Sequence, residues 1–206
     1  MPTVTGITQA SAQTAITTLG LQVGTVTQAF STSVAAGSVI SQSPAAGTSV
    51  ASGAAVDLVV SSTFTALNAT LTSIRYGHTA TLLPNGQVLF TGGWNGSSAL
   101  NTAELYDPVA NTFAAITASM ASPREAHAAA LLPSGLVLLS GGFNGASYLN
   151  SAELYDPIAK TFTALTATMT SIRYGNTATL LTSGQVLLAG GANGSKYVST
   201  AEIYEP

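Results

Sequence analysis

The chain has 206 residues, only 6% of them charged, and a formal net charge of −3. Its five lysines and arginines are too few for the basic stripe that a nucleic-acid backbone requires, so nucleic-acid binding is not expected. The lack of cysteine excludes disulfides, cysteine nucleophiles and thiolate metal sites. No apolar run approaches the roughly 18 residues of a membrane span, and the first residues do not have the pattern of a signal peptide. We therefore expect a cytosolic protein or an excerpt of a longer exported one.

Residues 1–61 predict a small α+β module. Thr8 is a plausible N-cap, and the residues after it place an apolar stripe on a short helix that ends near Gly20. Pro44 and Gly47 bracket a turn between the second and third of three expected strands. Those strands cover 21–27, 38–43 and 54–60.

Two stretches of this module carry a family resemblance, Gly-Leu-x-x-Gly at 20–24 and Val-Ile-x-Gln-x-Pro-x-x-Gly at 39–47. With them, residues 1–61 resemble a PASTA domain. The resemblance implies an extracellular bacterial module, which in some proteins contacts peptidoglycan and in others serves as a stalk. Asp57 is the only charged residue of the module and Phe30 its only aromatic one, so we favour the role of spacer over that of a ligand site.

Residues 62–206 repeat one pattern with a period of 49 residues and no insertion. An arginine recurs at 75, 124 and 173, a Gly-Gly pair closes an apolar run at 92, 141 and 190, and a Glu-x-Tyr segment begins at 104, 153 and 202. In the middle copy, turn residues separate four expected strands, at 126–132, 136–140, 152–155 and 161–165. Four antiparallel strands in each repeat form the blade of a β-propeller. The predicted blades cover about 75–118, 124–167 and 173–206.

The spacing, the glycines and the Glu-x-Tyr-Asp-Pro segments together resemble kelch repeats of the bacterial galactose-oxidase-like type. One departure is that the tryptophan usual in the fourth strand is Phe113 or Phe162 here. The expected fold is therefore mainly β, an incomplete kelch-type propeller of three four-stranded blades preceded by a small α+β PASTA-like domain. We expect the boundary between 61 and 62.

The phase of the repeat predicts that the propeller is open. Phe64 aligns with Phe113 and Phe162, so residues 62–67 are expected to form an orphan fourth strand, and the third copy stops after its third strand. Three blades are fewer than the usual four to eight. Further blades of a longer parent chain or a second copy would close the ring, and we favour the longer chain. The isolated chain is not expected to be a well-behaved monomer.

Nine of the 13 charged residues recur in phase with the repeat. In so uncharged a chain we interpret them as structural pairs, because a half-buried arginine needs a carboxylate partner. The alternative is that the three arginines share one pocket and bind an anion. The predicted pairs involve Arg75, Arg124, Arg173, Glu104, Glu153, Glu202, Asp107 and Asp156.

The residues that usually carry catalysis or metal binding are sparse. His78 and His127 recur in phase, but the third copy has Asn176, so we expect structural histidines near the propeller axis and no metal or cofactor. The resemblance to the galactose-oxidase type implies a copper radical site. Such a site needs a tyrosine cross-linked to cysteine, and this chain has no cysteine. We therefore expect no enzymatic activity.

The loops after the Gly-Gly pairs, at 94–100, 143–149 and 192–198, differ between copies where the strands do not. They should emerge on one face, where aromatic side chains could stack on a sugar ring or pack against the next blade. The expected function is non-catalytic binding of a glycan, cell wall or protein at a bacterial surface or in a secreted protein. Alternatives are a scaffold piece of a larger galactose-oxidase-like enzyme and a purely structural assembly module. The candidate ligand residues are Trp94, Phe143, Tyr148, Lys196 and Tyr197.

Overall fold

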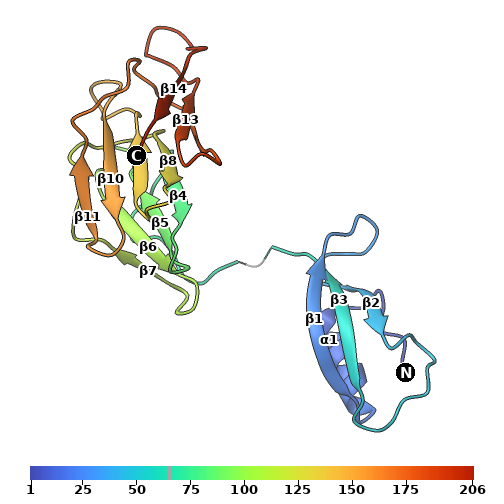
Figure 1. The fold of residues 1–206 in the computed structure, drawn as a ribbon. Coiled ribbons are helices and arrows are strands. Elements are labelled where there is room, and N and C mark those ends of the chain that lie inside the picture. Colours follow the sequence, from blue (N-terminus) through green and yellow to red (C-terminus); the bar gives the residue numbers. More distant parts are fainter. Residues whose placement is uncertain (65) are drawn as a thin grey trace. The chain divides into compact units, whose positions relative to one another are not determined.

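The computed structural model describes residues 1–64 and 66–206, and it divides the chain into two compact units, Met1–Ala66 and Leu67–Pro206 (Figure 1). The first unit holds a helix and a small sheet, and the second holds three further sheets. Among the described residues, no helix has the length and apolar character that crossing a membrane demands.

The first unit has the predicted helix and three strands. Helix α1 (Gln9–Thr18) starts after Thr8, whose side-chain oxygen accepts a hydrogen bond from the Ser11 N–H at 3.3 Å. It stops before Gly20, which has a φ of +72° and so supplies the left-handed residue that commonly ends a helix. The sheet has the order β1-β3-β2, in which β1 runs parallel and β2 antiparallel to the central β3. The strands are β1 (Gln22–Ala29), β2 (Val39–Ser43) and β3 (Ala55–Ser61).

One face of this sheet covers the helix. Ala12 and Ile16, four residues apart on α1, are fully buried, as the apolar spacing predicts. Burial of this apolar surface is the main stabilising contribution for so small a unit. The residues that complete the core are Val4, Leu21, Val39, Val56, Leu58 and Val60.

The second unit consists of three antiparallel sheets, one for each 49-residue copy. The first two sheets have four strands in simple sequential order, as the predicted blades require. The third sheet has three strands within the described residues. The first sheet consists of β4 (Thr79–Leu82), β5 (Val88–Thr91), β6 (Ala103–Asp107) and β7 (Thr112–Ala115). The second consists of β8 (Ala128–Leu131), β9 (Val137–Ser140), β10 (Ala152–Asp156) and β11 (Thr161–Ala164). The third consists of β12 (Thr177–Leu180), β13 (Val186–Ala189) and β14 (Ala201–Tyr204).

The blades pack face to face, which explains the unbroken apolarity of their inner strands. All four residues of β9 are buried, because the middle blade is covered on both sides. Leu89 and Leu105 of the first blade pack with Val137 and Tyr155 of the second. A second apolar cluster joins the middle blade to the third. The predicted architecture, a partial kelch-type propeller after a small α+β domain, is confirmed.

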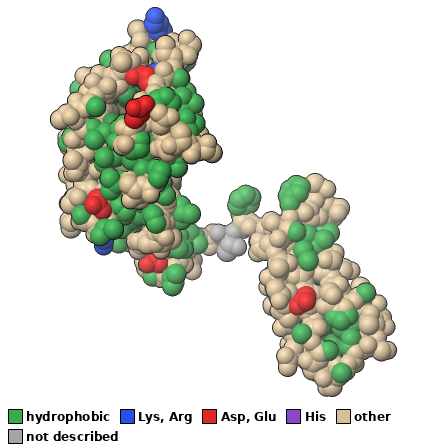
Figure 2. All heavy atoms as spheres, viewed as in Figure 1, with side chains coloured by type: hydrophobic (Ala, Val, Ile, Leu, Met, Phe, Trp, Pro, Cys, Tyr) green, Lys and Arg blue, Asp and Glu red, His purple; other side chains and the backbone are tan. Residues whose placement is uncertain are grey.

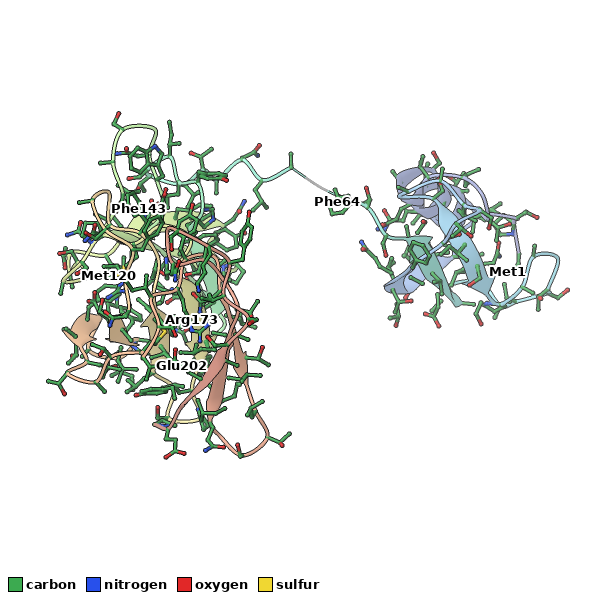
Figure 3. The ribbon with its side chains drawn as sticks, turned by 90° about the horizontal axis from the view of Figure 1, so that it is seen from above. Met1, Phe64, Met120, Phe143, Arg173 and Glu202 are labelled. Carbon is green, nitrogen blue, oxygen red and sulfur yellow. The ribbon has the colours of Figure 1, made fainter. Side chains whose placement is uncertain are left out.

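The strand predicted over 62–67 is not formed in the described residues. Residues 62–64 and 66–67 belong to no strand, and Thr65 lies outside the described part of the chain. Phe64 lies on the connecting segment with its side chain fully exposed (Figure 3). The physical reason is the lack of a partner: β7 and β11 form by pairing with the third strand of a blade, and no described blade precedes residue 62.

Candidate functional site

Each arginine of the repeat lies inside its own blade and contacts the phased glutamate. The shortest nitrogen-to-oxygen distances are 2.9 Å for Arg75–Glu104, 2.9 Å for Arg124–Glu153 and 3.0 Å for Arg173–Glu202. Figure 3 shows the last pair within the third blade. The arginine side chains are at most 1% exposed, so they do not present charge to an external anion.

Arg124 shows how completely this network uses the guanidinium group. Its nitrogen atoms donate two hydrogen bonds to Glu153, one to each of the carbonyl oxygens of Gly141 and Ser151, and one to the Ser151 hydroxyl, all between 2.9 and 3.2 Å. These five bonds tie the start of the blade to the end of its second strand and the start of its third. Burial lowers the pKa of Arg124, while the bonds and charge of Glu153 act in the opposite direction.

The glutamates also fix the segment that enters each blade. Glu104 accepts hydrogen bonds from the backbone N–H groups of Thr72 and Ser73 at 2.6 and 3.1 Å. Burial alone would raise the pKa of Glu104, but the hydrogen bonds from Thr72 and Arg75 outweigh burial and the pKa is lowered. The carboxylate therefore stays charged and acts as a structural clamp.

Asp107 and Asp156 do not pair with arginine, which corrects the prediction for these two residues. The Asp107 carboxylate accepts hydrogen bonds from the N–H groups of Val109 and Ala110 at 2.9 and 3.0 Å, and Asp156 makes the equivalent bonds. The reason is position along the strand: Asp107 lies three residues beyond Glu104, about 10 Å further from the arginine. These aspartates stabilise the Asp-Pro turn instead.

Of the two phased histidines, His127 lies at the junction between the first and second blades, whereas His78 contacts Arg75 and Phe90 of its own blade. His127 is buried, and its Nε2 lies 2.9 Å from both the Thr79 and the Thr91 hydroxyl oxygens of the preceding blade. Burial, followed by the charge of Arg124, lowers the pKa of His127 to about 3, so the imidazole is neutral. In residues 1–64 and 66–206, no group of three histidine, aspartate or glutamate side chains is arranged to hold a metal ion.

The three loops after the Gly-Gly pairs are built alike and lie at one end of the blades. In each, an asparagine side chain accepts hydrogen bonds from the N–H groups two and three residues further on, as Asn144 does from Ala146 and Ser147. The residue after each Gly-Gly pair also forms a backbone bridge with the residue after the arginine. We call this end of the blades the loop face, made of residues 94–100, 143–149 and 192–198 together with Tyr76, Glu125 and Tyr174.

Aromatic rings meet on the loop face at the junction of the second and third blades. The Phe143 and Tyr148 ring centroids are 4.9 Å apart, and the Tyr148 ring meets that of Tyr174 edge to face at 5.5 Å. Tyr148 also packs over Gly194 of the next blade, where an added Cβ would lie only 2.4 Å from the ring. Tyr148 therefore joins two blades, yet 38% of its surface stays exposed.

The other candidate residues are not part of this cluster. Trp94 is half-buried and its backbone pairs with that of Tyr76, at the same level of the first blade. Tyr197, the counterpart of Tyr148 in the third blade, is 91% exposed, because no described blade follows to cover it. Lys196 is exposed beside it.

Three loop-face residues were not predicted from the sequence, and each directly follows an arginine: Tyr76, Glu125 and Tyr174. Burial raises the pKa of Tyr174, and the nearby Glu125, Tyr76 and Tyr148 raise it further. Glu125, Tyr76 and Tyr148 therefore each lie within electrostatic reach of Tyr174. The copies differ at this position, Tyr, Glu and Tyr, and such variation beside an invariant arginine is a pattern that could have identified them.

Comparison with known families identifies both units. Residues 1–62 match the PASTA domain, and residues 75–117 and 126–167 match the Kelch motif. The chain thus joins a PASTA domain to Kelch motifs, and both are domain types that are not themselves catalytic.

A probable serine/threonine-protein kinase of Clostridium acetobutylicum is 40% identical to the chain over 80 residues. That stretch is 39% of this chain but 12% of the kinase. The matched stretch therefore corresponds to a small part of that relative, and the similarity does not carry kinase activity to this protein.

Proposed function

We propose that the chain is a non-catalytic binding module and that its loop face binds a glycan. The observation that supports this most directly is the grouping of Phe143, Tyr148 and Tyr174 with the carboxylate of Glu125. Aromatic faces stack on the apolar faces of sugar rings, and a carboxylate accepts hydrogen bonds from sugar hydroxyls. The hydrogen-bonded loops preorganise this surface, which lowers the ordering cost of binding.

We further propose an extracellular or cell-surface location, since PASTA domains occur in the extracellular portions of bacterial proteins. Within that setting the first unit would act as a spacer. Residues 1–61 contain one aromatic residue, the exposed Phe30, and one charged residue, Asp57, which is too few for a charged or aromatic ligand site. The Asp57 carboxylate is also engaged, because it accepts a hydrogen bond from the Thr25 N–H at 2.7 Å. Peptidoglycan binding by the first unit is the competing assignment.

The glycan proposal is tested with an array of bacterial and plant glycans, using the combined change Phe143→Ala and Tyr148→Ala, which removes two rings of the cluster. Binding should fall at least tenfold, because each ring contributes stacking area. The matched control is Phe30→Ala, which removes an exposed aromatic ring from the first unit and should leave the affinity unchanged. Circular dichroism would verify that the double variant is folded. Unchanged glycan binding by the double variant excludes the loop face, and peptidoglycan binding by residues 1–61 alone moves the activity to the PASTA domain.

The alternative is that the chain is a scaffold piece of a larger carbohydrate oxidase whose catalytic site lies outside these 206 residues. In either case we propose that the 206-residue chain has no turnover of its own. Oxidation of galactose or another primary alcohol by the purified chain, supplied with copper and oxygen, would contradict this proposal.

A further inference from the structure

The residues that follow the three arginines lie side by side across the blades. The Ala126 N–H donates a hydrogen bond to the Gly77 carbonyl oxygen of the first blade at 2.7 Å, and the Gly175 N–H of the third blade donates to the Ala126 carbonyl oxygen at 2.8 Å. Because the three backbones are joined at these positions, the residues just before them are neighbours. The middle blade contributes a carboxylate there and the blades on either side contribute a tyrosine each: Tyr76, Glu125 and Tyr174.

Backbone bridges extend each of these residues into a row of three. Glu125 pairs with Phe143, which pairs in turn with Tyr148. Directly opposed residues of paired strands have their side chains on the same side, so the row of the middle blade presents a carboxylate beside two aromatic rings. The rows of the first and third blades are Tyr76, Trp94 and Ala99, and Tyr174, Ala192 and Tyr197.

The two junctions between blades differ at the end of the row. At the second junction, Tyr148 covers Tyr174 and the glycine of the next loop. At the first junction, Ala99 stands in the position of Tyr148, and Glu125 stands in that of Tyr174. The glycine of the next loop is Gly145 there, and a Cβ added to it would meet no described atom within 4 Å. The first junction therefore has room for a ligand ring beside Glu125.

The charge of Glu125 is not balanced within the described structure. Glu125 and Lys196 are the charged residues of the loop face, and in residues 1–64 and 66–206 the salt bridges are those between arginines and glutamates inside the blades. Charged atoms are also sparse over the visible surface of the blade unit (Figure 2). A half-buried carboxylate without a cationic partner is unfavourable, and the faces of aromatic rings attract cations. This part of the loop face therefore complements a positively charged group.

Resting on the proposed glycan function, we infer that the loop face selects a sugar that carries a free, protonated amino group. The ammonium group lies against the Glu125 carboxylate, and the sugar ring takes the place at the first junction that the Tyr148 ring has at the second. Tyr76, which is 74% exposed, offers its ring to the same ligand. An ion pair and a cation–π contact together contribute on the order of tenfold in affinity. Acetylation of the amine removes its charge and both contacts.

Matched oligosaccharides test the charge preference. Oligomers of glucosamine and of N-acetylglucosamine, equal in length, are titrated into the full chain by calorimetry at about pH 6, where a primary amine is protonated. The glucosamine oligomer should bind about tenfold more tightly, and its advantage should shrink as salt is added, since salt screens an accessible ion pair. Equal affinities, tighter binding of the acetylated oligomer, or no binding of either would overturn the inference.

Glu125→Gln tests the residue itself. The substitution keeps the size of the side chain and removes its charge, so the affinity for the glucosamine oligomer should fall about tenfold while that for the acetylated oligomer stays unchanged. The matched control is Glu205→Gln, which removes an exposed carboxylate just beyond the end of β14 that is remote from the loop face and should change neither affinity. A preference for glucosamine that survives in Glu125→Gln would place the ammonium group elsewhere and contradict the inference.

The same measurements distinguish a failure of this inference from a failure of the proposed function. If both oligomers bind equally and the double change Phe143→Ala and Tyr148→Ala abolishes both, the loop face binds glycans without selecting charge, and only the inference is wrong. If no glycan of the array binds at the loop face, the proposed function fails and the inference fails with it. Glucosamine binding that is lost in Glu125→Gln and retained in Glu205→Gln supports both.

Discussion

At the scale of single residues, the ion pair of each blade could be predicted from the sequence, whereas the other contacts of its arginine could not. Arginine and glutamate spaced 29 residues apart in every copy predict an ion pair, because buried arginine requires a carboxylate. The contacts of Arg124 with the carbonyl groups of Gly141 and Ser151 could not be predicted, since every residue has a carbonyl and only the fold selects which one is near. The arginine pairing predicted for Asp107 was wrong, because the distance between the two side chains depends on the direction in which β6 runs, and only the fold determines that direction.

Arg124→Ala should lower the free energy of unfolding by about 3 kcal/mol or more, since it leaves the buried carboxylate of Glu153 without its charged partner. Arg124→Lys should be only partly tolerated, because one ammonium group cannot make five bonds in this planar arrangement. Denaturant unfolding measures both. Lys196→Ala, which removes an exposed positive charge, is the control, and a loss for Arg124→Ala no larger than its loss would contradict a structural role for the pair.

His127 should make the blades sensitive to acid. Its pKa is about 3 in the folded chain, against 6.5 for an unperturbed imidazole, so the unfolded chain binds more protons between these values. Stability contributed by the neutral imidazole is therefore complete above about pH 6.5 and decreases as the pH falls, by up to about 1.4 kcal/mol per unit.

The measurement is the free energy of unfolding from pH 7 to 5, compared with His127→Gln, whose side chain keeps a polar partner for Thr79 and Thr91. The difference between the two proteins should shrink steadily as the pH falls. Glu104 and Glu202, whose pKa values are lowered, titrate at lower pH and are common to both proteins. Parallel stability profiles would show that His127 binds a proton without a penalty in the folded state.

At the scale of elements, the 49-residue period predicts the strands because glycine, proline and aspartate punctuate each copy at the same places. Observed strands are shorter than predicted, as for the first strand of the middle blade, expected over 126–132 and found at Ala128–Leu131. Ala126 has a φ of +47° and joins its neighbours on adjacent blades by backbone hydrogen bonds. Contacts between blades therefore set the strand ends, and these are invisible in a single repeat.

The Gly-Gly pairs should act mainly at the junctions between blades. A Cβ at Gly141 would lie 2.3 Å from the Arg173 carbonyl oxygen, so Gly141→Ala should separate the second and third blades and lower the midpoint of thermal unfolding. Gly175→Ala is the matched control, because its φ of +66° is close to the +69° of Gly141 and nothing lies within 4 Å of the added Cβ. Alanine already occupies the equivalent position, 126. Equal shifts for the two variants would attribute the effect to backbone conformation alone.

At the scale of the whole molecule, the sequence predicts two units and an open set of blades, and the structure has both. The sequence could not predict which residues form the aromatic cluster of the loop face, because Tyr148 contacts Tyr174 only when two blades are packed together. For the same reason, the orphan strand was predicted from alignment although its formation depends on a partner edge that the described chain does not supply. The repeat pattern identifies which strand a segment corresponds to, but the strand forms only where a neighbouring strand is available to pair with it.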